Sequence, residues 1–364
     1  MTILMILAGF VLLVAGAELL VRGASRLAQA VGIPALIVGL TVVAFGTSAP
    51  EFAVSVQAGL EGQASIALGN VVGSNICNIL LILGLSAVAA PLVASSQLVR
   101  LDVPVMIGVS LLVWLLATDG EIGRAEGVVL TAGLVAYTSF LILLAKRQNS
   151  RAKSDETRES SGDARTWRQL TVSAFFVAAG LALLVLGARW LVHGAVDLSR
   201  WLGVSELLIG LTIVAGGTSL PELATSLVAG LRGERDIAIG NVVGSNIFNL
   251  LGVLGASAAV AGAGVAVDPA ALRFDIPVMT AAAIACLPVF FTGGRISRGE
   301  GLLLLAYYVA YLAFLALQAT ASSRFTTYTN AMLYIVIPLT FVGLICSVLH
   351  ALRWGRRHGE EGQS

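Results

Sequence analysis

Long apolar runs separated by short polar stretches fill most of this chain. A helix needs about 17 or more mainly apolar residues to cross a bilayer. Runs of this length lie near residues 2–28, 33–60, 66–93, 102–118, 125–145, 169–200, 204–231, 237–262, 274–292 and 299–319. A further apolar run covers 330–352. The pattern predicts an all-α polytopic membrane protein with ten core helices and a probable eleventh helix at the C-terminus.

The central part of the first half of the chain returns in the second half. Gly39 to Gly84 aligns without a gap with Gly210 to Gly255, and the two copies match at 30 of 46 positions. The flanks also correspond, so each half is predicted to be a five-helix unit. An odd number of helices makes the second unit enter the membrane from the opposite side, which is the inverted repeat of secondary transporters.

These boundaries divide the chain into four expected segments. Residues 1–145 form the first repeat, 146–168 a charged and flexible linker, and 169–320 the second repeat. Residues 321–364 hold the extra helix and a basic tail. The N-terminal run has no basic region before it and no evident cleavage site, so it is interpreted as the first span.

Composition and the placement of charge support a membrane protein. Hydrophobic residues make up 57% of the chain and charged residues 12%, with a net charge of +1. Of the 22 Lys and Arg residues, 17 fall on the face that holds the linker. The positive-inside rule therefore places the N-terminus outside and the linker and C-terminus in the cytoplasm. We expect a multi-pass plasma membrane protein, such as one of a prokaryotic inner membrane.

Two glutamates lie deep inside apolar runs. Glu51 and Glu222 each follow a Gly-Thr-Ser stretch and a proline, which predicts a broken helix at that point. Backbone groups that lack helical hydrogen bonds at membrane depth must be buried in protein or line a cavity. A carboxylate at such a place is a candidate functional group. The alternative is a capping box, because Ser48 and Ser219 precede the glutamates with S-x-x-E spacing.

A second polar cluster, GNVVGSN, follows in both copies. Its glycines fit close helix packing, but that packing does not explain the clustered amides and hydroxyls. Ser74 and Asn78 share a helical face, as do Ser245 and Asn249. Together with the two carboxylates these are oxygen donors, which suit Ca²⁺, and Na⁺ could use the same oxygens. The three histidines lie outside the cluster and the three cysteines are isolated, which argues against zinc or copper.

At these residues the chain resembles the calcium/cation antiporter superfamily, whose two repeats carry GTS-x-PE and GN-x-x-GSN-x-x-N. The resemblance covers about residues 1–320 and implies a ten-helix exchanger core that moves calcium against sodium, or against protons in some branches. It implies that Glu51 and Glu222 are the principal calcium ligands. It implies further ligands at Thr47, Ser48, Ser74, Asn78, Thr218, Ser219, Ser245 and Asn249.

Two features depart from the family pattern. Some relatives carry aspartate at the position of Asn249, which lowers the expectation of potassium co-transport. The 146–168 linker is too short for the calcium-sensing domains of animal exchangers.

Three classes of function fit a polytopic chain of this kind. An antiporter fits inverted repeats and paired carboxylates, whereas a channel would need a continuous pore and an enzyme a nucleophile–base pair or an open metal site. We expect a calcium/sodium antiporter that is not an enzyme and needs no cofactor, with a proton/calcium antiporter as the alternative. Its partners would be ions and the lipid bilayer, not nucleic acid. The oligomeric state, the stoichiometry and the coupling ion stay open.

Overall fold

The computed structural model describes residues 2–155, 163–203, 215–291, 294–340 and 342–343. Within these residues, eight helices are long and apolar enough to cross a membrane, and one bent pair of helices makes a ninth span. The predicted all-α polytopic fold is confirmed. Of the span predicted at 204–231, residues 204–214 lie outside the described part, as do residues 344–352 of the predicted eleventh helix.

The first half consists of helices, short π-helical or 3₁₀ turns (η) and two short strands. In chain order these are α1 (Thr2–Val31), α2 (Ala35–Val38), η1 (Gly39–Val43), α3 (Ala44–Thr47), α4 (Ala49–Leu60), α5 (Ala64–Ile76), η2 (Cys77–Leu83), α6 (Gly84–Ala89), β1 (Leu92–Val93), η3 (Leu98–Asp102), α7 (Val103–Leu116), η4 (Ala117–Asp119), β2 (Glu121–Ile122) and α8 (Arg124–Asp155).

The described part of the second half has a similar order of elements. Its elements are α9 (Asp163–Trp201), α11 (Ala215–Gly217), α12 (Leu220–Leu231), α13 (Arg235–Phe248), η6 (Asn249–Leu254), α14 (Gly255–Val260), β3 (Val265–Ala266), η7 (Ala271–Asp275), α15 (Ile276–Phe291), β4 (Arg295–Ile296) and α16 (Arg298–Ala319). Beyond the repeat follow α17 (Phe325–Ala331) and η8 (Met332–Val336).

The segment expected to be a flexible linker is partly helical. Helix α8 continues to Asp155 and α9 begins at Asp163, so only residues 156–162 lie outside the described part. The charged composition suggested a solvated coil, but strong helix formers such as Ala, Lys and Arg let both membrane helices continue into it. Composition alone could not separate these outcomes.

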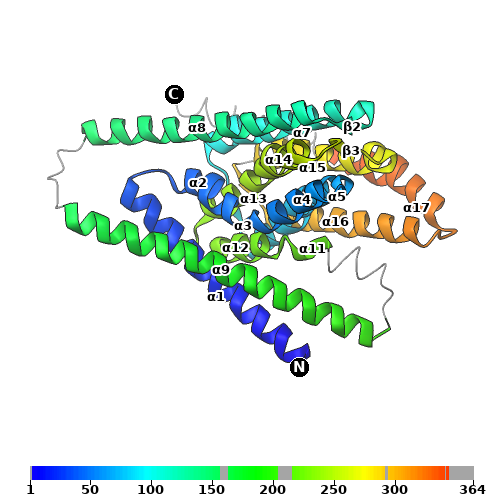
Figure 1. Ribbon diagram of the computed structural model, residues 1–364, viewed down its shortest axis with the longest axis horizontal. Helices are drawn as coiled ribbons and strands as arrows, with labels where there is room; N and C mark the ends of the chain where they lie inside the picture. The colour runs from blue at the N-terminus through cyan, green and yellow to red at the C-terminus, as the bar shows by residue number, and fades with distance from the viewer. Residues whose placement is uncertain (1, 156–162, 204–214, 292–293, 341, 344–364) are drawn as a thin grey trace, which may run out of the picture.

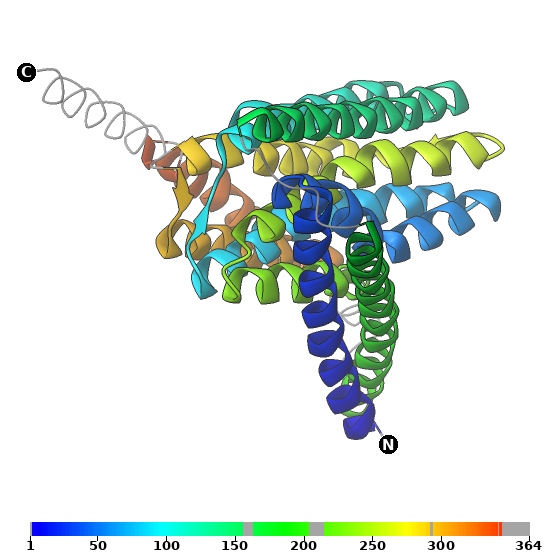
Figure 2. The same cartoon turned by 90° about the vertical axis from the view of Figure 1, so that its left-hand side faces the viewer.

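Helices α1 and α9 pack against each other along most of their length, and Figure 2 shows this pair running across the direction of the other helices. Each helix presents glycines at seven-residue intervals, namely Gly9, Gly16 and Gly23 on α1 and Gly180, Gly187 and Gly194 on α9. A Cβ added to Gly16 would lie 2.8 Å from the carbonyl oxygen of Gly180, and one added to Gly9 2.8 Å from that of Gly187. The order of these contacts makes the two helices antiparallel. Small residues let the backbones approach this closely.

Two short antiparallel pairings join the halves. Leu92 of β1 pairs with Ile296 of β4, and Glu121 of β2 pairs with Ala266 of β3. The helices that carry GNVVGSN lie at the centre of the fold (Figure 1). All residues in the apolar window of the Arg235–Val260 span are buried, and 78% of those in the Ser65–Ala89 window are. The second copy of the polar cluster is therefore entirely buried, and in the first copy Ser74 and Asn75 are buried while Gly69 is exposed.

Candidate cation site

The predicted helix break is present in the first half and its counterpart begins at the same place in the second. The helical segment Ala35–Thr47 bends by 49° into α4. Ser48 precedes α4, and Ser219 precedes α12. Pro50 and Pro221 lie in the first turn of these helices, where a missing N–H costs no helical hydrogen bond. Glu51 and Glu222 directly follow these prolines, so both buried carboxylates lie in the first turn of a helix.

Each glutamate is held by a serine from the other half. The Ser48 hydroxyl donates to Glu222 Oε1 at 2.8 Å, and the Ser219 hydroxyl donates to Glu51 Oε1 at 3.2 Å. Both glutamate side chains are completely buried. Neither serine side chain caps its own helix, so the capping-box interpretation is wrong for both motifs. Each hydroxyl instead donates to the carboxylate across the interface, and its oxygen accepts no hydrogen bond from the first N–H groups of its own helix.

Several buried side-chain oxygens, including one from each carboxylate, have no hydrogen-bond partner among the described residues. Those at the residues expected to be ligands are Glu51 Oε2, Glu222 Oε2, Asn78 Oδ1, Asn249 Oδ1 and Ser245 Oγ. Buried polar atoms in proteins are nearly always paired, so a concentration of unpaired acceptors needs an explanation. Two carboxylates and neutral oxygens are the ligand types that hard cations such as Ca²⁺ prefer.

The two asparagines at the end of the motif differ in their contacts. Asn249 Nδ2 donates to Asn75 Oδ1 at 3.1 Å, and Asn75 Nδ2 donates to the Asn246 carbonyl at 3.3 Å. These two hydrogen bonds orient the Asn249 amide so that its nitrogen donates and its oxygen has no hydrogen-bond partner in the described part. Neither amide atom of Asn78 has a partner in the described part of the chain.

The two serines of this cluster are also inequivalent. Ser219 donates to Ser74 Oγ at 3.2 Å, which links Ser74 to the Glu51 side of the site. Ser245 is fully buried and its hydroxyl is unpaired within the described residues. The structure thus brings Ser48, Ser74 and Ser219 into contact with one another or with the carboxylates.

The two threonines before the helix starts donate hydrogen bonds to asparagines. The Thr47 hydroxyl donates to Asn241 Oδ1 at 3.0 Å, and the Thr218 hydroxyl to Asn70 Oδ1 at 3.5 Å. Each threonine hydroxyl therefore donates to an asparagine of the opposite half. This leaves their backbone carbonyls as the groups that the break could offer to an ion.

Sequence reasoning missed the role of these asparagines. Asn70 Nδ2 donates to the Glu51 carbonyl at 3.3 Å, and Asn241 Nδ2 to the Glu222 carbonyl at 3.4 Å. Each asparagine thereby braces the glutamate backbone of its own half while accepting from the threonine of the other half. Their repeated position in GNVVGSN was the available signal, but it does not distinguish a brace from a ligand.

Soft metal chemistry is not supported by the described residues. Cys77 and Cys286 are buried free thiols, and Cys346 lies outside the described part. No group of three or more His, Cys, Asp or Glu side chains converges within the part of the chain that the structure describes. The buried site is therefore built from two carboxylates and neutral oxygens.

A helical membrane protein with this buried oxygen site belongs, by fold and chemistry, to the class of membrane proteins that handle hard cations. Comparison with known proteins defines the family. The model of the sodium/calcium exchanger protein family matches residues 1–143 and 172–317.

Similar proteins come from bacteria and archaea. The putative antiporter CaxA of Alkalimonas amylolytica is 42% identical, over 72% of this chain and 82% of that protein. The sodium/calcium exchanger MaX1 of Methanosarcina acetivorans is 33% identical, over 74% of this chain and 85% of that protein. A solved structure of the sodium-calcium exchanger NCX_Mj is 29% identical with a TM-score of 0.73, covering 86% of this chain and 97% of that one.

The chain belongs to the sodium/calcium exchanger family. The expected resemblance to calcium/cation antiporters is thereby confirmed, and so is the expectation of a transporter that is not an enzyme. The family moves Ca²⁺ and Na⁺ as substrates and needs no cofactor.

Proposed function

We propose that this chain exchanges Ca²⁺ for Na⁺ across a membrane by alternating access, with the ions bound between Glu51 and Glu222. The observation that carries the proposal is the pair of crossed hydrogen bonds from Ser48 to Glu222 and from Ser219 to Glu51. These bonds draw both carboxylates into one site at the interface of the halves. A site between two repeats is where secondary transporters bind their substrates.

The proposed ligands are the residues expected from the sequence. The unpaired oxygens of Glu51, Glu222, Asn78, Asn249 and Ser245 support direct roles as ligands. Ser48, Ser74 and Ser219 would orient the carboxylates and offer hydroxyl oxygens. Thr47 and Thr218 would contribute through their backbone carbonyls, because their hydroxyls are already engaged.

Charge balance supplies the reason for exchange. Two ionised carboxylates carry two negative charges, which one Ca²⁺ or two Na⁺ would neutralise. An unmatched charge in a buried site is costly, so calcium and sodium would exclude each other there. The same cost would oppose the change between access states when both carboxylates are ionised and no cation is bound.

Sodium is the favoured coupling ion, with protons as the alternative. The relative MaX1 is named a sodium/calcium exchanger, and the NCX_Mj structure was determined with Na⁺ and Ca²⁺. The test is calcium uptake into vesicles that contain the purified protein, with an imposed sodium gradient and separately an imposed proton gradient. Uptake driven by sodium alone would support the proposal, and uptake driven only by protons would overturn the sodium assignment. A channel would be indicated if a cation on the opposite side of the membrane did not accelerate calcium uptake.

The proposed arrangement has two inverted five-helix repeats, 1–145 and 169–320, with the N-terminus outside. The antiparallel packing of α1 and α9 supports the inversion, because these are the first helices of the two halves. The distribution of Lys and Arg supports the orientation, which places the 146–168 segment and the C-terminus in the cytoplasm.

A further inference from the structure

Helix α1 is tied to the turn between α12 and α13 by charged and polar side chains. Glu18 forms ion pairs with Arg22 of its own helix and with Arg232 at the end of α12. The Ser25 hydroxyl donates to Glu234 Oε1 at 2.7 Å. Ionisable residues inside a hydrophobic span are usually paired in this way.

The internal repeat gives the central ion pair a counterpart with reversed signs. At the offset of 171 residues, Glu18 corresponds to Arg189 on α9, and Arg232 corresponds to Glu61 at the end of α4. Both signs change together, so the counterpart pair again joins an acid to a base. The Ser25–Glu234 hydrogen bond is different, because Ser25 corresponds to a valine that has no polar side-chain atom.

In the structure the counterpart pair is apart. Helix α1 packs along α12, whereas α9 and α4 are not packed against each other in the described part of the chain. Glu61 accepts a 2.8 Å hydrogen bond from Gln57, and Arg189 has no described hydrogen bond or ion pair. The two halves are similar in sequence but differ here in arrangement.

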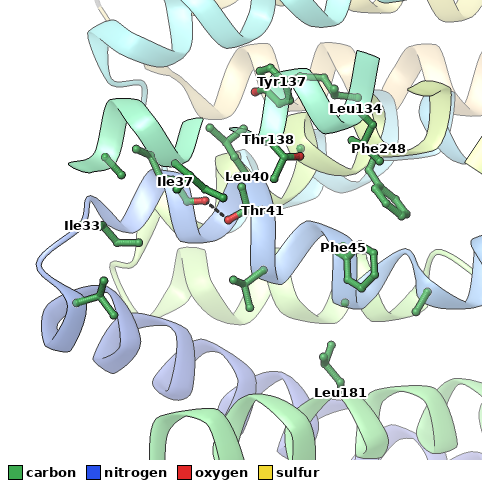
Figure 3. Close-up of a pocket in the computed structure, with 18 of the residues that line it drawn as sticks. Ile33, Ile37, Leu40, Thr41, Phe45, Leu134, Tyr137, Thr138, Leu181 and Phe248 are labelled. Carbon is green, nitrogen blue, oxygen red and sulfur yellow. Dashed lines mark hydrogen bonds between the residues drawn. The ribbon is translucent and has the colours of Figure 1, made fainter. Parts of the chain in front are cut away.

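A cavity occupies the space beside Arg189. It measures about 960 Å³ and lies between α9 and the surfaces of α2, α3 and α8. Figure 3 shows Leu181 of α9 on the opposite side of this cavity from Leu40 and Thr41. The cavity thus leaves space for α9 to shift towards the first half, and such a shift would close the cavity.

We propose that Glu18–Arg232 and Arg189–Glu61 are two alternating latches that position the α1–α9 pair during transport. The first holds α1 in the state described here, and the second holds α9 in the opposite access state, in which the two halves exchange arrangements. This inference rests on the proposed alternating-access function. These are positioning residues, because they touch neither the buried carboxylates nor the ions. The additional Ser25–Glu234 hydrogen bond makes the first latch the stronger one, which favours the state described here.

Charge reversal tests the two latches in opposite directions. Glu18→Arg would face Arg22 and Arg232 and depopulate the described state, whereas Arg189→Glu would face Glu61 and depopulate the opposite state. The apparent affinity for an ion falls with the fraction of molecules open to its side. In oriented vesicles, Glu18→Arg should raise the calcium KM on the face open in the described state and lower it on the other, by roughly twofold to fivefold for partly exposed ion pairs. Arg189→Glu should shift both KM values in the reverse direction.

The double variant Glu18→Arg with Arg232→Glu copies the polarity of the Arg189–Glu61 pair and should move the ratio of the two KM values back towards the wild-type ratio. Restoration should be partial, because Arg22 also faces the changed side chain at position 18. Asp197→Asn, an exposed charge change elsewhere on α9, should leave the ratio unchanged. If Glu18→Arg does not fold, Glu18→Gln gives a smaller shift in the same direction. Shifts in the same direction for both reversals, no shift, or a double variant whose ratio stays at that of Glu18→Arg would overturn the latches. Any of these results would overturn only the latches and not the exchange activity of the wild type. Absence of calcium–sodium exchange by the wild type would overturn the proposed function itself.

Discussion

The hydroxyl of Ser48 donates a 2.8 Å hydrogen bond to the carboxylate of Glu222, which lies 174 residues further along the chain. The reciprocal bond joins Ser219 to Glu51. Each half therefore orients the carboxylate of the other half. Loss of either serine or displacement of either half would disturb the position of a charge that belongs to its neighbour.

Removal of one carboxylate should abolish high-affinity calcium binding. Glu222→Gln leaves a bound Ca²⁺ with one uncompensated positive charge in a buried site, and Glu51→Gln does the same. Removal of one partner from a buried charge pair costs about 3–5 kcal/mol, so the calcium affinity should fall by roughly a hundredfold or more. Isothermal titration of calcium into the purified variants measures this loss.

The matched control for these variants is Glu300→Gln. Glu300 lies in the N-terminal capping box of α16, away from the two buried carboxylates. This change should lower stability slightly and leave calcium affinity unchanged. If either Glu51→Gln or Glu222→Gln kept the wild-type affinity, the paired-carboxylate site would be wrong.

An added carboxylate at position 249 should alter ion preference. In Asn249→Asp, an oxygen replaces the amide nitrogen that now donates to Asn75 Oδ1, so two oxygens would face each other. The third negative charge needs a proton or a further cation to balance it. We expect transport to be retained but to become dependent on pH and to show a steeper dependence on sodium. Vesicle flux at several pH values and sodium concentrations tests this, and Asn249→Ala serves as the uncharged comparison. A profile identical to that of Asn249→Ala would refute a role for charge at this position.

Enlargement of the α1–α9 interface should destabilise the protein. In Gly16→Val, the new side chain would begin 2.8 Å from the Gly180 carbonyl oxygen, so the two helices must separate. Overpacking of this kind costs about 1–3 kcal/mol. Gly108 on α7 offers the comparison, because a Cβ added there meets no atom within 4 Å. Thermal unfolding in detergent should show a lower Tm for Gly16→Val than for Gly108→Val, and equal values would argue against close packing at Gly16.

The proposed orientation predicts which loops face the outside. Gln63 is exposed in the turn between α4 and α5 and should be external, whereas residue Ser160 should be cytoplasmic. Single cysteines at these positions, in a chain without its three native cysteines, can be treated on intact cells with a thiol reagent that does not cross membranes. Labelling at position 63 only is expected. Labelling at position 160 only would reverse the orientation.

Hydrophobic periodicity and the internal repeat were sufficient to predict the helical fold and the helix break before Glu51. Both follow from local physical chemistry, because a buried carboxylate and a proline carry strong signals within a few residues. The family was recognised from the resemblance of the two repeated motifs and not from physical chemistry. The helical continuation of α8 to Asp155 was not predicted, since charged residues suit a helix and a coil almost equally.

The crossed contacts could not be read from sequence. Ser48 and Glu51 have the spacing of a capping box, and only the three-dimensional approach of the second half shows that the Ser48 hydroxyl donates to Glu222 instead. Asn70 and Asn241 look like Asn78 and Asn249 in sequence, yet the first pair braces backbone carbonyls while the second leaves oxygens unpaired. Identical side chains thus acquire different roles from the element that faces them.

The two short strand pairings have a consequence for motion. Strands β1 and β2 lie on either side of α7, and β3 and β4 on either side of α15, so the two pairings join both ends of α7 to both ends of α15. A displacement of α7 along α15 would break backbone hydrogen bonds at both ends. Helices α1 and α9 lie outside these pairings and pack against each other through glycines. The backbone pairings therefore hold α7 and α15 together, whereas side-chain contacts such as Glu18–Arg232 hold α1 against the second half.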